Sequence, residues 1–336
     1  MMRATHYQHS FDDKLAKELR KILSLDAAEE GPGFLPTDIP GLVLWLDASD
    51  TSKVILTYST DGLSGVTASG VAGSHTVTTS GNVSAQLKAG ARIRLGGAGL
   101  ITTASTLGTN TYTIASITST TITTVETLSQ TYNVGTGLYR GLVSQLTDKS
   151  STGANAAQST ASAMPLWISN GQNGLGTLKF DGADRLVTNT FTFTQPATQF
   201  LSFNASSVAS GNNYIYDGIS NNSNVLQIYG KLGIYNGSGS ALWGGSGGYT
   251  ISTGVNYLTS AVVNGASSSL FLNGGNQLTG NPGGGNPNGL TLGNYAGGGY
   301  GFDGYIYEYI GYSSALPTNA RNLAEQYQAA QWGIIL

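Results

Sequence analysis

The sequence predicts an all-β protein that carries a helical arm at its N-terminus. Charged residues make up 10% of the 336 residues and hydrophobic residues 40%, so the chain has enough apolar side chains for a sizeable core. Runs such as residues 111–118 alternate polar with β-branched or aromatic side chains, which is the pattern of a half-buried strand. Asn-Gly pairs such as Asn273-Gly274 lie between strand-like runs and predict tight hairpins.

Residues 1–40 form the predicted arm. Ser10 is a suitable N-cap for a helix, and residues 26–40 form a linker with Pro and Gly but no periodicity. The apolar stripe of this helix has three interpretations: it packs on the chain's own sandwich, it anchors the chain in a partner or in a trimer-forming bundle, or it lies on a membrane surface. The acidic residues Asp12, Asp13 and Glu18 disfavour the membrane. The apolar side chains at helical spacing are Phe11, Leu15, Leu19, Ile22 and Leu23. We expect Phe34, Leu35 and Ile39 to fasten the linker to a surface.

The strand-rich body begins at Gly41 and contains an insertion. Residues 41–57 and 141–336 are predicted to form one sandwich, and residues 58–140 a small β-barrel or β-sandwich domain inserted into it. Strand-like runs at residues 88–97 and 111–128 support the insertion. The alternative is that these strands extend the main sheets. An insertion between two neighbouring strands is tolerated because its ends lie close together.

The C-terminal part reads as a strand, a turn and a closing helix. Both faces of the strand are largely apolar, so it is predicted to lie inside the sandwich. The helix is expected to have Thr318 as its cap and Gly333 as its stop. Strict alternation places Tyr305, Tyr307 and Tyr309 on one face, and Ile306, Glu308 and Ile310 on the other.

Three separated stretches resemble laminin G-like modules of the concanavalin A-like lectin/glucanase superfamily. They are GLVLWLDASD from Gly41, LTDKSSTGANAAQ followed by LKFDGADRL from Leu146 to Leu186, and FDGYIYEYIGYSSAL with the helix after it from Phe302. The resemblance implies a concanavalin-like jelly-roll β-sandwich over residues 41–57 and 141–333. The segment 58–140 is similar to small β-barrel inserts of phage structural proteins.

Such modules are common in phage virion proteins and bacterial surface proteins. The N-terminus lacks an apolar signal-peptide core, which favours a virion protein made in the host cytoplasm. The sequence thus predicts a capsid-associated, tail or fibre protein that displays a lectin-like domain and binds other virion proteins, or itself, through the arm. The alternative is a bacterial surface adhesin that binds glycans.

Other classes of partner and activity are not expected. The net charge of −3 argues against nucleic acid, and no apolar run is long enough to span a bilayer. Retaining glycoside hydrolysis needs two carboxylates about 5 Å apart. After the linker, Glu126, Glu308 and Glu325 are isolated in the sequence. A glycoside hydrolase is therefore disfavoured, and no catalytic residue and no cofactor is predicted.

Aromatic and polar residues in Gly-rich segments suggest a glycan-binding rim. Aromatic faces pack against the C–H surfaces of sugars, although Trp and Tyr also fill sandwich cores. The resemblance also leaves calcium open, with Asp217 and Asn221 as candidate ligands; the alternative is that these residues form a turn. The candidate glycan-binding residues are Trp243, Tyr249, Asn294, Tyr295 and Tyr300.

Overall fold

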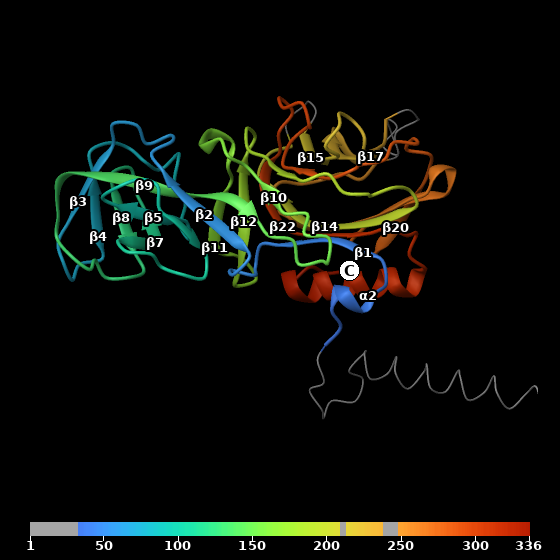
Figure 1. The fold of residues 1–336 in the computed structure, drawn as a ribbon, viewed down its shortest axis with the longest axis horizontal. Helices are drawn as coiled ribbons and strands as arrows, with labels where there is room; N and C mark the ends of the chain where they lie inside the picture. Colours follow the sequence, from blue (N-terminus) through green and yellow to red (C-terminus); the bar gives the residue numbers. More distant parts are fainter. Residues whose placement is uncertain (1–32, 209–212, 238–247) are drawn as a thin grey trace, which may run out of the picture.

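The computed structural model describes residues 33–208, 213–237 and 248–336, which form two β-rich lobes side by side (Figure 1). Every pairing between named strands in these residues is antiparallel, and the described part of the chain has one α-helix, α2 (Thr318–Trp332). The prediction of an all-β protein is confirmed. The helical arm lies outside the described residues, as do Phe11, Leu15, Leu19, Ile22 and Leu23. The short 3-10 helices are η1 (Pro36–Asp38), η2 (Ala161–Ala163) and η3 (Gly265–Ser267).

The first sheet of the large lobe is built around β22 (Asp303–Tyr312). One side of β22 pairs with β14 (Ala197–Ala205), and its other side pairs with β12 (Leu175–Asp181) and β1 (Leu42–Asp47). Beyond β14 the sheet continues through β18 (Asn256–Val263), β19 (Ser268–Leu272) and β20 (Gly275–Gly280). The turn between β19 and β20 has Asn273 and Gly274 at φ 49° and 69°, the left-handed pair that the Asn-Gly signal predicts.

The second sheet of the large lobe faces the first. Tyr216 of the second sheet meets Tyr309 of the first edge to face, with ring centroids 5.5 Å apart. Apolar side chains of both sheets, such as Phe203 and Leu226, share one buried core. The second sheet runs in the order β17 (Lys231–Tyr235), β16 (Val225–Tyr229), β15 (Asn213–Asp217), β21 (Thr291–Leu292), β13 (Leu186–Thr188) and β10 (Ala156–Ala157).

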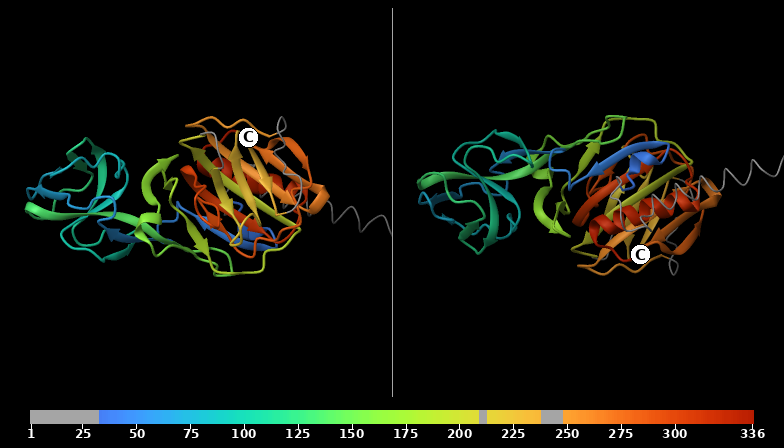
Figure 2. Two further views of the ribbon diagram at one scale, coloured as in Figure 1. Left: turned by 90° about the horizontal axis from the view of Figure 1, so that it is seen from above. Right: turned by 90° about the horizontal axis from the view of Figure 1, so that it is seen from below.

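The small lobe has a hydrophobic core of its own, which includes Val77, Ile93 and Ile114. It lies at one end of the long axis of the molecule (Figure 2). Its strands are β3 (Thr67–Gly70), β4 (Thr76–Thr79), β5 (Arg92–Leu95), β7 (Thr111–Ile117) and β8 (Thr121–Thr124). The lobes are joined through β2 (Val54–Ser59), β6 (Ile101–Thr103), β9 (Tyr132–Leu146) and β11 (Leu166–Gln172).

The junction shows how the small lobe is inserted. Tyr58 of β2 pairs with Gly141 of β9, so the two ends of the insertion are cross-strand neighbours. The core of the small lobe nevertheless extends beyond residue 140, because Leu142, Leu166 and Ile168 belong to it. Independent folding of residues 58–140 stays a prediction.

β22 is an interior strand, as predicted, but its predicted faces are wrong. The pairing with β14 shifts between Glu308 and Ile306, which marks a β-bulge at Tyr307. The bulge shifts by one residue the alternation of side chains between the two faces of the strand. Ile306 and Tyr309 therefore point into the core between the sheets, whereas Tyr307 stacks on Trp332 of α2. Glu308 contacts α2 as well, because its carboxylate accepts a bond from Trp332.

Helix α2 lies across the outer face of the first sheet (Figures 1 and 2). It ends at Gly333, whose φ of 62° is the left-handed conformation predicted for the stop. The predicted cap is wrong: Pro317 precedes the helix, and Thr318 is its first residue. The linker packs here too, because Phe34 meets the ring of Tyr327 and Ile39 is buried, whereas Leu35 is exposed.

Candidate functional site

A loop between β21 and β22 carries three of the residues predicted to bind glycans. Asn294 is buried, and its Oδ1 accepts the backbone N–H groups of Tyr295 at 2.9 Å and Tyr300 at 3.3 Å. The loop begins at Gly293, where φ is +81° and a Cβ atom would lie 2.1 Å from the Phe180 ring. Only glycine fits there. Asn294 thus organises the loop from inside and leaves the two tyrosines at its surface.

The carboxylate of Asp217, at the end of β15, ties this loop to the neighbouring turn. Its Oδ1 accepts N–H groups of Gly218 at 2.7 Å, Ser223 at 3.2 Å and Asn224 at 3.4 Å. Its Oδ2 accepts those of Asn222 at 3.0 Å and Ala296 at 3.2 Å. Burial raises the pKa of Asp217, and the hydrogen bonds from backbone amides oppose that rise.

These hydrogen bonds satisfy the buried carboxylate of Asp217 without a metal ion. Its two oxygens already accept five N–H groups, whereas calcium needs about six or more free oxygen ligands. Asn221 is exposed on the same turn. Within the described residues, no group of three or more His, Cys, Asp or Glu side chains is placed to hold a metal ion. The arrangement has the character of a turn fixed by an aspartate.

Tyr214, Tyr295 and Tyr300 form a tyrosine cluster beside this turn. The ring centroids lie 5.1 Å apart for Tyr214 and Tyr295, 5.8 Å for Tyr214 and Tyr300, and 5.6 Å for Tyr295 and Tyr300. Tyr214 is buried at the base, and its hydroxyl donates to Asn222 Oδ1 at 2.9 Å. Tyr300 is 46% exposed, so the cluster presents a supported aromatic side chain to solvent.

The remaining predicted glycan-binding residues are not in this cluster. Tyr249 packs against the core of the large lobe, and its hydroxyl donates to the Leu270 carbonyl at 2.9 Å. Trp243 lies outside the described residues. Sequence reasoning missed Tyr214, which is a strand residue 81 positions before Tyr295. The pairing of β15 with β21, and the hydrogen bond from the Tyr214 N–H to the Tyr300 carbonyl at 2.9 Å, bring them together.

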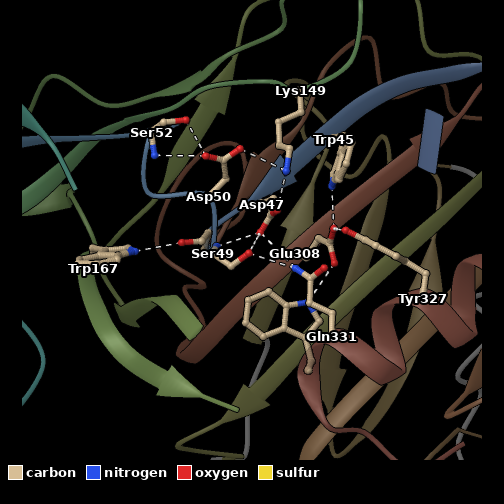
Figure 3. Close-up of polar contacts among 12 residues, drawn as sticks. Trp45, Asp47, Ser49, Asp50, Ser52, Lys149, Trp167, Glu308, Tyr327 and Gln331 are labelled. Atoms are coloured by element: carbon tan, nitrogen blue, oxygen red, sulfur yellow. Dashed lines mark hydrogen bonds and ion pairs between the residues drawn. The ribbon is translucent and has the colours of Figure 1, made fainter. Parts of the chain in front are cut away.

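Glu308 is the centre of a buried polar network between the first sheet and α2 (Figure 3). Its carboxylate accepts the indole N–H groups of Trp45 at 2.7 Å and Trp332 at 2.9 Å, and the hydroxyl of Tyr327 at 3.2 Å. Burial, and then the nearby Asp47 carboxylate, raise the pKa of Glu308 to about 7. These neighbours surround Glu308 completely, which suits a structural role.

Asp47 is the second carboxylate of the network. Lys149 lies 2.8 Å from Asp47 and 3.3 Å from Asp50, and its ammonium sits 4.0 Å from the centroid of the Trp45 ring. Asp47 is 3% exposed and Glu308 is fully buried, so neither carboxylate reaches a substrate in this conformation. The two buried acids join β1, β22 and α2.

Comparisons with known proteins give distant structural similarity only. No family model and no curated protein matches the sequence. Domain 4 of an extracellular arabinanase from Geobacillus stearothermophilus, in complex with arabinotriose, shares 14% identity at a TM-score of 0.41, over 53% of this chain and 92% of that one. A GH54 α-L-arabinofuranosidase shares 11% identity at a TM-score of 0.47, over 85% of this chain and 66% of that one.

The binding domain of a Paraclostridial mosquitocidal protein shares 13% identity at a TM-score of 0.39, over 55% of this chain and 49% of that one. With TM-scores below 0.5, these similarities assign neither a ligand nor an activity to this chain.

In the described residues, no helix has the length and apolar character needed to cross a membrane.

Proposed function

We propose that this chain is a glycan-binding domain whose tyrosine cluster packs against sugar rings. The observation that carries the proposal is the exposed Tyr300, supported from below by Tyr214 and from the side by Tyr295. A supported ring loses little side-chain entropy on binding and offers an apolar face to the C–H surface of a sugar.

Polar groups for sugar hydroxyls lie beside the rings. Arg185 donates from Nη1 to the carbonyl of Ala296 at 3.2 Å, which places its guanidinium along the loop. Asn222 is half-buried on the neighbouring turn, where its Oδ1 already accepts the Tyr214 hydroxyl. An aromatic surface bordered by amide and guanidinium groups is suited to a neutral polyhydroxylated ligand.

We infer that the large lobe is a concanavalin-like jelly roll of the laminin G-like type. The stretches that resemble the family fall on β1, β12 and β22, and both β1 and β12 pair with β22. Two facing antiparallel sheets further support this architecture. The role that we propose is binding without hydrolysis, because the best candidate acid, Glu308, is enclosed by Trp45, Trp332 and Tyr327.

The same resemblance supports a place on a phage virion, as a capsid-associated, tail or fibre component. In this proposal residues 1–40 attach the chain to other virion proteins or to copies of itself. The linker is suited to such an arm, because Phe34 and Ile39 fasten its end to the apolar cluster between the first sheet and α2.

A glycan microarray with bacterial surface polysaccharides tests the proposal. Wild-type protein should bind a subset of the glycans, and Tyr300→Ala should lose that signal while it melts like the wild type. The bound glycans should not be cleaved, as measured by release of reducing ends. Binding that is unaffected by Tyr300→Ala would show that the tyrosine cluster is not the glycan-binding site. Cleavage of a bound glycan would contradict a purely binding role.

A further inference from the structure

A cleft of about 430 Å³ lies between the two lobes and has walls from both. The small lobe contributes Gln86 and Lys88, and β9 contributes Arg140; the large lobe contributes Asp181 and Asp184. The volume is within the range of small-molecule sites, which form preferentially where two domains meet. No residue of the tyrosine cluster lines this cleft, so it is a separate site.

The charges of the cleft are largely compensated within the protein. Arg140 pairs with Asp61 at 2.5 Å, and Lys179 forms an ion pair with Asp303. Lys88 and Asp181 remain as exposed charges of opposite sign. Because both signs line the walls, neither a strongly anionic nor a strongly cationic ligand is favoured there.

Asp184 adds to the cleft a carboxyl group that can both donate and accept hydrogen bonds. It is 5% exposed, and its Oδ2 accepts the backbone N–H of Asp181 at 3.0 Å. Burial, and then the Asp181 carboxylate, raise the pKa of Asp184 to about 8. Near neutral pH the acid is therefore mostly protonated and uncharged, and its O–H is a hydrogen-bond donor.

Two further polar groups in the residues that line the cleft lack partners within the protein. Gln86 Oε1 is a buried acceptor, and Arg140 Nε is a buried donor. Buried polar atoms are normally paired, so either of these two would gain a hydrogen bond from a ligand group that comes within reach. A hydroxyl group satisfies either of them, because it donates one hydrogen bond and accepts others. The cleft also has an apolar part, formed by Met164, Leu166 and the ring of Tyr305.

We propose that the inter-lobe cleft binds a neutral polyhydroxylated ligand of mono- or disaccharide size, held between Gln86 and Lys88 of the small lobe and Asp181 and Asp184 of the large lobe. The hydroxyl groups of the ligand pair with these polar side chains, and its C–H surface packs on the apolar part. Because the ligand touches both lobes, it also fixes their relative position.

The test uses D-glucose, D-galactose, N-acetyl-D-glucosamine and L-arabinose, with disaccharides of each, as probes of the full chain. Binding is measured by saturation-transfer NMR and mapped by hydrogen exchange. At least one probe should bind and should protect backbone amides at residues 85–88 of the small lobe and 179–185 of the large lobe. Failure of every probe to bind, or protection confined to one lobe, would overturn the proposal.

Variants then locate the binding. Ala85 is exposed and lines the cleft, so Ala85→Trp should fill it and weaken binding at least tenfold, about 1.4 kcal/mol. Ala72, an exposed alanine of the small lobe that does not line the cleft, provides the control Ala72→Trp, which should bind normally. Asp181→Asn, at an exposed position, should weaken binding without filling the cleft, which covers the case in which Ala85→Trp misfolds.

The tyrosine cluster provides the last comparison. Tyr300→Ala should leave binding in the cleft unchanged. If Tyr300→Ala abolishes binding of the probe and Ala85→Trp and Asp181→Asn do not, the ligand occupies the tyrosine cluster and the cleft is not a site.

Discussion

Asp47 and Glu308 lie directly opposite each other in the β1–β22 pair, and both carboxylates are buried. Lys149 pairs with Asp47, whereas Glu308 has only neutral donors, the indoles of Trp45 and Trp332 and the hydroxyl of Tyr327. Without a cationic partner for Glu308, burial first and the Asp47 carboxylate second raise the pKa of Glu308 to about 7.

The raised pKa predicts that stability falls as pH rises from about 4.5 to 7. In this window the folded protein keeps a proton on Glu308 that the unfolded chain releases, so the free energy of unfolding decreases with pH. The slope for one such group is at most about 1.4 kcal/mol per pH unit. Asp184, whose pKa is raised to about 8, acts in the same direction.

Urea denaturation at pH 5 and at pH 7 measures this effect. Glu308→Gln should show a smaller loss of stability between the two pH values than the wild type. The control is Asp50→Asn in the same network, because Asp50 is partly exposed and its pKa is lowered. Burial acts to raise the pKa of Asp50, but the hydrogen bond from Ser52 and the Lys149 ammonium together outweigh it. An equal pH dependence in wild type and Glu308→Gln would show that Glu308 does not keep its proton in the fold.

Calcium is predicted to have no effect on thermal stability. The oxygens of Asp217 are occupied by five backbone N–H groups, so a calcium ion would have to displace them. Melting temperatures in millimolar calcium and in EDTA should therefore agree. A rise in melting temperature with calcium that Asp217→Asn removes would restore Asp217 and Asn221 as metal ligands.

Removal of the small lobe is predicted to leave the large lobe folded. Tyr58 and Gly141 are cross-strand partners, so a short Gly-containing turn can join β2 to β9 as a hairpin. The deletion exposes Leu166 and Ile168, which should be replaced by Thr to limit aggregation. A single cooperative melt of the shortened protein is the expected result; a broad, non-cooperative transition would mean that the lobes fold only together.

The arm is predicted to mediate assembly. Burying the apolar stripe of residues 11–23 is worth roughly 1.5–3 kcal/mol for each large side chain, so two charges in the stripe should abolish association. The double variant Leu15→Asp and Leu19→Asp should therefore lower the mass measured by light scattering, or release the protein from particles, with an unchanged melt of the sandwich. Loss of the melt with unchanged association would make the arm an internal part of the fold.

Local signals in the sequence predicted the features that depend on near neighbours. Alternation located β22, Asn273-Gly274 located a hairpin, and Gly333 located the end of α2. The bulge at Tyr307 was not predictable, because the sequence alternates without interruption across it.

Long-range pairing limited the prediction of the site. Tyr249 and Tyr300 both lie near Gly-rich segments, yet Tyr249 packs on the core and Tyr300 is exposed, since strand pairing decides which way a loop faces. Glu308 has no acidic neighbour two or four residues away, and its acidic partner Asp47 comes from the other end of the chain. The inter-lobe cleft likewise combines segments that no local pattern relates.

Sugar packing on the tyrosine cluster is tested by calorimetric titration of a glycan selected on the array into wild type, Tyr300→Phe and Tyr300→Ala. Tyr300→Phe keeps the ring, so its affinity should stay within about threefold of wild type, whereas Tyr300→Ala removes the ring and should bind roughly tenfold more weakly. Equal affinity for all three proteins, or an equal loss in both variants, would contradict sugar packing on the tyrosine cluster.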